Sequence, residues 1–289
     1  MSASTLAAST ERCNWPGCAR LPPLNPFVYE KDGRLNRFYF CREHYEEASH
    51  VTVAPGRDTD EMMEKMYGSR FRHASFDTYL TDDAYFERIN RSGPQVPYTP
   101  EIVQNIRTAK AKVERFAKTA VETRHGSCLL CGSPGGGKTH LGAASARLFV
   151  ENGLVVSRWT GVRLLTAIRH TYSSNYSEQQ STVQGIISDM LRADAVMIDD
   201  LLESCFARDV RDYLFEIIDG VYSKQRILFL STNFSVDQLA SDGSGPPNPE
   251  PARLGRAAID RLLHPPSELV DLIVPSMRVT LRQLDRAHG

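Results

Sequence analysis

Hydrophobic and polar positions follow two different rhythms in the second half of the chain. Four short runs are almost wholly apolar: SCLLC at 127–131, LVVSRW at 154–159, AVMID at 195–199 and ILFLST at 227–232. Such runs, without polar alternation, predict strands of a parallel sheet that is covered on both faces. Helical patterns lie between or after them, at 138–151, 161–172, 182–193 and 207–223. This alternation predicts an α/β domain.

A further helical pattern precedes these runs, and its start is well marked. Thr99 can cap the helix, Pro100 suits its first turn, and Glu101 favours the positive end of the helix dipole. Apolar residues then recur every three or four positions, at Ile102, Ile106, Ala109, Val113, Phe116 and Ala120. The preceding RSGPQVPYTP, rich in proline, marks a boundary.

A glycine-rich loop follows the first apolar run. It matches the motif G-x-x-x-x-G-K-[ST], so the expected nucleotide-binding residues are Gly132, Ser133, Pro134, Gly135, Gly136, Gly137, Lys138, Thr139 and His140. Glycines let consecutive amides surround phosphate oxygens, and the next helix points its positive end at the same anion. Lys138 would reach the β- and γ-phosphates, and Thr139 would bind Mg²⁺. A glycine turn with a solvated lysine is the alternative, but the strand before the loop and the helix after it favour ATP binding.

Acidic and amide side chains follow two other apolar runs. Asp199 and Asp200 end AVMIDD, and Asn233 ends ILFLSTN. Two carboxylates at the end of a buried strand are costly unless a cation neutralises them. We therefore expect Asp199 to hold Mg²⁺, Asp200 to polarise the water that attacks the γ-phosphate, and Asn233 to orient that water. The alternatives are a helix-capping pair of aspartates and a turn asparagine.

A metal site is indicated near the start of the chain. Two close pairs of potential zinc ligands lie there, Cys13 with Cys18 and Cys41 with His44. Two such pairs separated by one loop are how a small module collects four tetrahedral ligands. The loop predicts a hairpin around Asp32-Gly33, and Zn²⁺ would supply stability that so small a core lacks. Unrelated reduced thiols are the alternative, and His50 is a substitute for His44.

Composition and charge exclude several other classes of protein. Apolar residues make up 41 % and charged residues 24 % of the 289 residues, as in ordinary globular proteins. No apolar run is long enough to span a membrane, and the first residues do not resemble a secretory signal. The net charge of −1 means that any nucleic-acid contact is local or arises on assembly. Six cysteines are too few for a disulfide scaffold, which favours a cytoplasmic protein.

Two of those cysteines need a separate interpretation. Cys128 and Cys131 have the C-x2-C spacing of metal ligands. They lie in the run that leads into the phosphate loop, where small sulfur side chains pack well. We therefore expect them to be core residues.

These patterns divide the chain into four parts: a disordered tail at 1–12, the zinc-binding module at 13–50, a linker with short helices at 51–98, and the ATPase domain at 99–289. One short helix is expected within 58–71, and the stretch 241–252 is expected to be a flexible loop because of its proline and glycine content.

Taken in order, the motifs resemble those of DnaC/IstB-type AAA+ ATPases, which include replicative helicase loaders and the ATPase subunits of some transposons. The similar segments are LLCGSPGGGKTHLGAASA, VMIDDLLE, ILFLSTNF, AIDRLL, VPSMR and, upstream of them, FDTYL at 76–80. Together they cover roughly residues 75–286. The resemblance implies an AAA+ P-loop fold with a parallel sheet covered by helices.

The resemblance also implies roles for two arginines. Arg261 is similar to the arginine finger that reaches the γ-phosphate on a neighbouring subunit, with Arg256 as its rival. Arg278 is similar to the second sensor, which contacts the nucleotide of its own subunit. Surface salt bridges are the alternative for both. Asp200 departs from many AAA+ proteins, which carry glutamate there, although aspartate also occurs in this family.

The function implied by the resemblance is ATP-dependent loading of a replicative hexameric DNA helicase onto single-stranded DNA. The zinc-binding module would bind the helicase, and the AAA+ core would self-associate on ATP and DNA. The first alternative is an IstB-like transposition ATPase that recruits a transposase to target DNA. A protein-remodelling AAA+ factor is another, and so is a DNA-binding regulator with structural ATP, although a regulator would not need Asp200 and Asn233.

Overall fold

The protein is described by a computed structural model in which the chain divides into two units, Met1–His50 and Val51–Gly289. The residues that the structure describes are 27–31, 34–38, 51–53, 58–79, 81–91, 97–170, 176–201, 208–241 and 253–276. The predicted tail and most of the loop predicted at 241–252 lie outside them.

The first unit contains an antiparallel pair of strands, β1 (Phe27–Lys31) and β2 (Arg34–Phe38). Pairing runs from Phe27 opposite Phe38 to Lys31 opposite Arg34, so two residues connect the strands. The hairpin predicted around Asp32-Gly33 is confirmed. The predicted zinc ligands Cys13, Cys18, Cys41 and His44, and the substitute His50, lie outside the described residues.

The second unit is built on a six-stranded sheet in the order β3-β5-β6-β7-β4-β8. Five neighbouring strands are parallel, and β3 pairs antiparallel with β5 at one edge. The strands are β3 (Val51–Val53), β4 (Gly126–Gly132), β5 (Val156–Thr160), β6 (Ala195–Leu201), β7 (Ile227–Thr232) and β8 (Ser267–Leu272). The predicted α/β class is confirmed, as are the four predicted strands. β3 and β8 were not expected.

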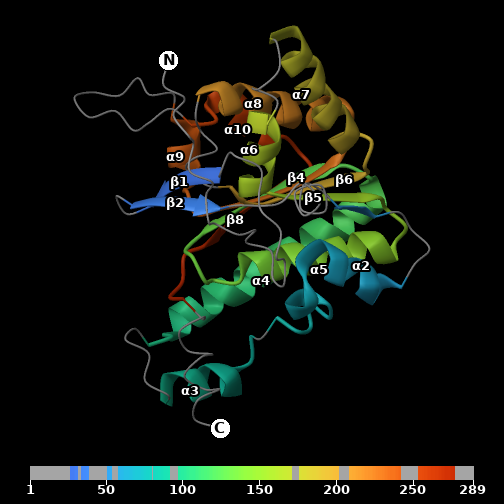
Figure 1. The fold of residues 1–289 in the computed structure, drawn as a ribbon. Helices are drawn as coiled ribbons and strands as arrows, with labels where there is room; N and C mark the ends of the chain where they lie inside the picture. The colour runs from blue at the N-terminus through green and yellow to red at the C-terminus, as the bar shows by residue number, and fades with distance from the viewer. Residues whose placement is uncertain are drawn as a thin grey trace, which may run out of the picture. The chain divides into compact units, whose positions relative to one another are not determined.

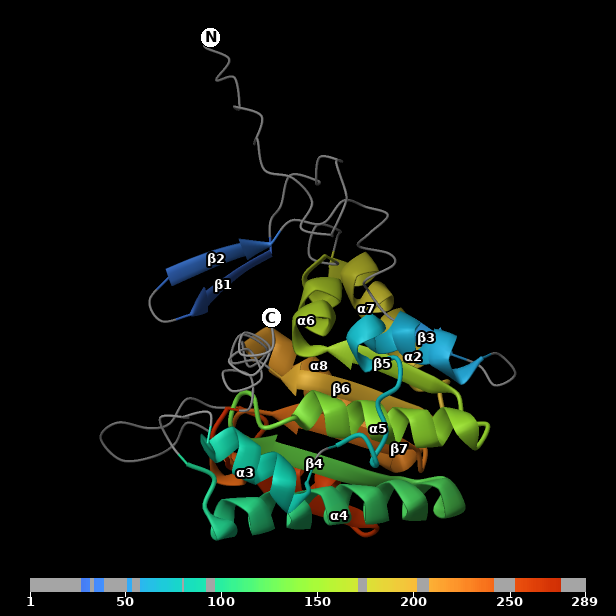
Figure 2. The same cartoon turned by 90° about the horizontal axis from the view of Figure 1, so that it is seen from below.

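Helices cover both faces of this sheet, as Figures 1 and 2 show. One layer holds α2 (Thr59–Tyr67), α4 (Pro100–Thr123) and α5 (Lys138–Glu151), and the other holds α6 (Gly161–His170), α7 (Tyr176–Met190), α8 (Arg208–Ser223) and α10 (Arg256–Leu262). The remaining helical segments are the 3-10 helix η1 (Ser69–Phe71) and the helices α3 (Asp83–Arg91) and α9 (Val236–Ala240). Thr99 caps α4 as predicted, accepting a hydrogen bond from the Ile102 amide. None of the helices described is long and apolar enough to cross a membrane.

The segment predicted as a linker contributes directly to the second unit. β3 extends the sheet beside β5, and the one short helix expected within 58–71 is α2, which packs on α5. Its three methionines Met62, Met63 and Met66 are buried in the main core. The sequence alone does not show that this segment belongs to the core. Methionines on one face of a short helix become buried only because α5 packs against them.

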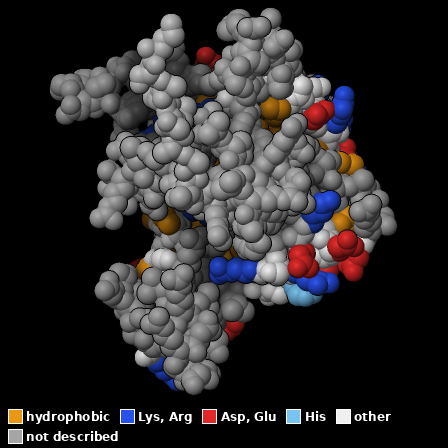
Figure 3. Space-filling model, viewed as in Figure 1, with side chains coloured by type: hydrophobic (Ala, Val, Ile, Leu, Met, Phe, Trp, Pro, Cys, Tyr) orange, Lys and Arg blue, Asp and Glu red, His pale blue; other side chains and the backbone are white. Residues whose placement is uncertain are grey.

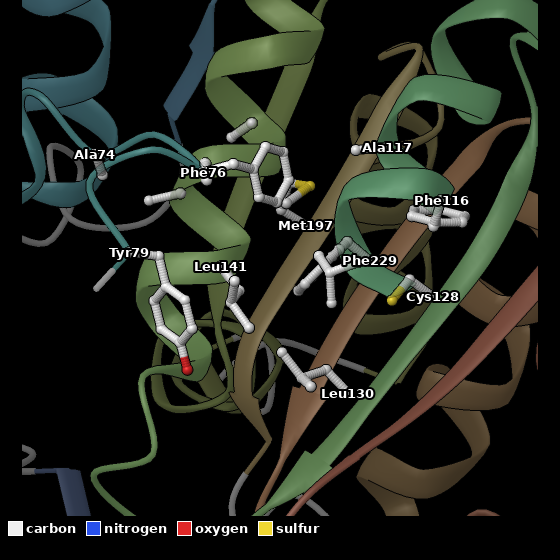
Figure 4. Close-up of a cluster of buried hydrophobic side chains, with 14 of the residues drawn as sticks. Ala74, Phe76, Tyr79, Phe116, Ala117, Cys128, Leu130, Leu141, Met197 and Phe229 are labelled. Atoms are coloured by element: carbon white, nitrogen blue, oxygen red, sulfur yellow. The ribbon is translucent and has the colours of Figure 1, made fainter. Parts of the chain in front are cut away.

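The main core lies between the sheet and the α4–α5 layer. Figure 4 shows Phe76 beside Met197 of the sheet, Leu141 between Tyr79 and Phe229, and Phe116 of α4 near Cys128. Phe229 and Leu141 are fully buried. This packing holds the end of β4 and the start of α5, and therefore the loop between them, in one position.

Candidate functional site

The glycine-rich loop runs from the end of β4 to the first residue of α5. At its end Gly137 has a φ of 92°, in the left-handed region that favours glycine. A Cβ at Gly137 would also lie 2.6 Å from the Tyr79 ring, and one at Gly132 would collide with the Leu272 carbonyl of β8. The loop therefore approaches its neighbours at positions that only glycine allows.

The Lys138 ammonium lies inside this loop and is buried. Its Nζ donates to the carbonyl oxygens of Gly132 and Ser133 at 2.9 and 3.0 Å, and to Asn233 Oδ1 at 2.8 Å. Asn233 follows β7, the strand next to β4. Since the carboxyl ends of parallel strands meet at one edge of the sheet, two residues far apart in the sequence come into contact here.

Asp199 lies at the same edge, at the end of β6, and is 8 % exposed. Its Oδ1 accepts a 2.6 Å hydrogen bond from Ser231 Oγ and lies 3.5 Å from Thr139 Oγ1. Its Oδ2 lies 3.2 Å from Arg158 Nη2 of β5. The predicted Mg²⁺ pair, Thr139 and Asp199, is therefore brought together.

Asp200 is exposed and has a φ of 55°, a conformation that aspartate tolerates better than most residues. Its amide donates to Ser231 Oγ at 2.9 Å, and its Oδ1 accepts from Asn233 Nδ2 at 3.3 Å. A strained backbone that presents a carboxylate is frequent at functional sites. The two groups predicted to handle the attacking water are thus in contact; Asn233 accepts a hydrogen bond from Lys138, and Asp200 is linked to Lys138 through Asn233.

The segment before α4 reaches the same loop. The Tyr79 hydroxyl donates to the Gly136 carbonyl at 2.9 Å, and the Tyr79 ring lies 5.4 Å from that of His140. His140 Nε2 is 3.1 Å from the Ser75 carbonyl and 3.2 Å from Thr78 Oγ1. Burial lowers the pKa of His140. The His140 imidazole is therefore occupied by contacts with residues 75–79. The predicted contact of His140 with the nucleotide would be made by its backbone amide.

Of the two arginines with predicted roles, the structure describes only Arg261. Arg261, in α10, forms an ion pair within its own chain, with Nε 2.5 Å from Asp219 Oδ1 and its guanidinium carbon 4.8 Å from the Phe215 ring centroid. Its rival Arg256 is exposed at the start of the same helix. Arg278 lies outside the described residues. The roles of all three remain predictions.

Cys128 and Cys131 are buried in β4, as expected of core residues. Burial raises the pKa of the Cys128 thiol well above its usual value and that of Cys131 to about 12. In the part of the chain that the structure covers, no cluster of three or more His, Cys, Asp or Glu side chains is placed to hold a metal ion.

Sequence reasoning missed two residues that hold Asp199. Ser231 was read only as part of an apolar strand, and Arg158 as part of another. The signal for Arg158 was a lone arginine within LVVSRW, because a buried guanidinium needs a nearby acid. Nothing local marked Ser231, whose partner is thirty-two residues away.

The assembled groups fit a nucleotide with Mg²⁺. The loop has glycine where a Cβ would collide, and it precedes a helix that begins at Lys138. The paired oxygens of Thr139 and Asp199 are the hard donors that Mg²⁺ prefers. Residues Gly132, Lys138, Thr139, Asp199, Asp200 and Asn233 therefore form one candidate ATP site.

Comparisons with known proteins agree with this site. The model of a family described as IstB-like ATP binding protein matches residues 103–285. An insertion sequence ATP-binding protein of Sinorhizobium fredii is 29 % identical over 139 residues, which are 47 % of this chain and 41 % of that protein. The chain therefore spans less than half the length of this relative.

Two solved structures are also similar. A crystal structure of the DnaC helicase loader is 20 % identical, with a TM-score of 0.46, covering 71 % of this chain and 99 % of that one. AMPPCP-bound DnaA from Aquifex aeolicus is 15 % identical, with a TM-score of 0.47, covering 64 % of this chain and 52 % of that one.

Proposed function

The chain belongs to the IstB-like family of ATP-binding proteins, and on this premise we propose that it hydrolyses ATP to load a replicative DNA helicase onto single-stranded DNA. One observation carries the ATPase part. Lys138, Asn233 and Asp200 form a continuous chain of hydrogen bonds beside the Thr139–Asp199 pair. A protein that only bound ATP would have no use for an exposed carboxylate and a carboxamide at that position.

The residues of this chain divide the chemistry among them. Lys138 would contact the β- and γ-phosphates once these replace the loop carbonyls around its ammonium. Asp200 would polarise the attacking water, and Asn233 would orient that water through the amide that now contacts Asp200. Mg²⁺, held by Thr139 and Asp199, would supply positive charge for the phosphate oxygens. Arg278 would contact the same nucleotide.

Assembly would complete the site if Arg261 acts on a neighbouring subunit, because its guanidinium can stabilise charge on the γ-phosphate. In the face shown in Figure 3, acidic and basic side chains are interspersed over the described surface. This agrees with a net charge of −1. With this neutral total, contact with single-stranded DNA would use basic groups gathered by self-association.

The separate first unit is the part proposed to bind the helicase. It is a unit distinct from the ATPase core, and its four candidate ligands Cys13, Cys18, Cys41 and His44 would bind Zn²⁺. Zinc would stabilise a segment with a small core, which then presents a folded surface to a protein partner.

A second candidate function is supported by a specific observation. The relative from Sinorhizobium fredii is described as an insertion sequence ATP-binding protein. The same ATP site would then serve a transposition ATPase that recruits a transposase to target DNA. The two functions differ in the DNA that they should require, which is single-stranded for the loader and duplex for the transposition ATPase.

ATP turnover measured with either DNA tests both proposals. We expect phosphate release from the full chain, stimulated by single-stranded DNA more than by duplex DNA. Stimulation by duplex DNA alone would favour the transposition ATPase, and zinc-replete, folded protein with no ATP binding would refute both.

Two variants separate binding from hydrolysis. Lys138→Ala should lose ATP binding, whereas Asp200→Asn should retain it and hydrolyse at least about a hundredfold more slowly, since it lacks the carboxylate that polarises water. Asp237→Asn, an exposed acid in the first turn of α9, is the matched control and should turn over like the wild type. Normal turnover by Asp200→Asn would remove Asp200 from the mechanism.

A further inference from the structure

A buried arginine lies beside the carboxylate proposed to hold Mg²⁺. Arg158 is 7 % exposed, and its Nη2 lies 3.2 Å from Asp199 Oδ2. A guanidinium keeps its charge under all physiological conditions, so burying it requires an acid nearby. Asp199 is that acid, and its negative charge is therefore already balanced by this chain before any metal is present.

The arginine is held in place from a second side. Its guanidinium carbon lies 4.5 Å from the centroid of the Tyr67 ring, contributed by α2. Burial raises the pKa of the Tyr67 phenol, so this ring stays neutral. Arg158 is thus enclosed between a neutral aromatic face and Asp199.

This ion pair is incompletely satisfied. Within the described residues, the buried Nε of Arg158 has no hydrogen-bond partner. A buried pair with an unmet donor adds little to stability, because desolvation offsets the attraction between the charges. Folding stability alone is therefore a poor reason for an arginine in this apolar strand.

A second arginine interacts electrostatically with Arg158. Arg163 lies in the first turn of the neighbouring helix α6, and its pKa falls to about 10, through burial first and the charge of Arg158 second. The groups that surround Asp199 are thus Ser231 and Thr139 on Oδ1 and Arg158 on Oδ2. A divalent cation that reaches Oδ1 alone meets a carboxylate whose charge is already neutralised and a guanidinium that repels it.

We propose that Arg158 is a resident counter-cation of Asp199, which Mg²⁺ must displace or outcompete, so that Arg158 raises the Mg²⁺ concentration that nucleotide binding by this chain requires. The inference rests on the proposed nucleotide site. In it, Arg158 sets how much Mg²⁺ that site needs to bind a nucleotide. Arg158 acts through Asp199 and is a positioning residue.

The main test measures how nucleotide binding by full-length Arg158→Met depends on the Mg²⁺ concentration. The anisotropy of a fluorescent ATP analogue reports the binding. Methionine fills similar space without a charge. We expect the Mg²⁺ concentration at half-maximal binding to fall by about tenfold, because the competing cation is gone. In excess EDTA, binding by the variant should not exceed that of the wild type.

A similar but more exposed ion pair lies at the opposite end of β6. Arg226 Nη1 is 3.0 Å from Asp194 Oδ1, and the Nε of Arg226 likewise lacks a partner within the described residues. Arg226→Met should leave the Mg²⁺ midpoint unchanged, because this pair does not contact the proposed metal site. If Arg158→Met does not fold, Arg158→Lys takes its place. It keeps the charge but loses the planar contact with Tyr67, so its midpoint should fall by less.

A second measurement needs no nucleotide. Millimolar MgCl₂ alone should raise the melting temperature of Arg158→Met, whose Asp199 is unpaired, and leave that of the wild type unchanged. Equal Mg²⁺ responses of the wild type and the Arg158 variant in both measurements would overturn the inference. If the wild type binds no nucleotide, the proposed function fails, while the melting experiment still decides the role of Arg158.

Discussion

At the scale of single residues, the phosphate loop depends on a tyrosine that precedes it by more than fifty positions. The Tyr79 hydroxyl donates to the Gly136 carbonyl, and the ring fills the space beside Gly137. Because the Gly136 carbonyl is already hydrogen-bonded to Tyr79, it need not turn toward the phosphate site. The amides of the loop can therefore point into that site. Tyr79 therefore supports a loop shape that is ready for an anion.

Removing that hydroxyl gives a direct prediction. Tyr79→Phe should weaken ATP binding by roughly three- to tenfold, since one hydrogen bond contributes about 1 kcal/mol and the Gly136 carbonyl would lose its partner. Isothermal titration with a non-hydrolysable ATP analogue measures the change. Tyr222→Phe, on the exposed surface of α8, should bind like the wild type. Equal affinities for the two variants would show that the contact does not shape the loop.

At the scale of elements, α5 connects the ATP site to the segment upstream of it. Arg147 of α5 donates to the Ala74 and Arg72 carbonyls and forms an ion pair with Asp60 at 2.6 Å. These contacts join residues 58–79 to the helix that starts at Lys138. Helix α5 therefore holds the segment that carries Tyr79, and Tyr79 in turn supports the loop at the start of α5.

Breaking this junction should affect both stability and binding. Arg147→Ala should lower the free energy of unfolding by about 2 kcal/mol, because charge-assisted hydrogen bonds to three groups are lost, and should also weaken ATP binding. Chemical denaturation measures the first effect, and trypsin cleavage at the nearby Arg70 and Arg72 should become faster. Arg192→Ala, which breaks an exposed pair with Asp189, is the control and should change neither property. Unchanged cleavage would mean that the segment is held by its methionines alone.

At the scale of the whole molecule, the chain divides into two units, to which the proposed function gives separate tasks. A deletion that tests the first unit has to end at residue 50, since β3 begins at Val51 and belongs to the sheet. A longer deletion through residue 98 would also remove Met63 and Met66, which are fully buried in the core. Loss of a partner would then be indistinguishable from loss of folding.

The shorter deletion should separate partner binding from ATP binding. Without residues 1–50 the protein should still bind ATP, because the site lies in the second unit, but it should no longer retain a hexameric replicative helicase in a pull-down. The full chain serves as the reference. Retention of the helicase by the deleted protein would contradict the assignment of the first unit, and capture of a transposase instead would favour the second candidate function.

The sequence by itself determined the elements whose signals are local. The apolar runs of β4 and β7, the glycine-lysine loop, the start of α5 and the Thr99 cap of α4 all follow from neighbouring residues, and so does the hairpin of β1 and β2. Edge strands gave weaker signals. β3 has only three residues and β8 carries two acids, so neither shows the continuous apolar run of a buried strand.

Only the tertiary structure decided which of these elements meet. Placing β7 between β6 and β4 brings Asn233 to both Asp200 and Lys138, and placing β5 beside β6 gives Asp199 its arginine. Tyr79 and Gly136, fifty-seven positions apart, meet because the segment before α3 packs against the loop that precedes α5. Periodicity reports whether a residue is buried, but the partner of a buried polar group depends on strand order and layer packing, which no local pattern contains.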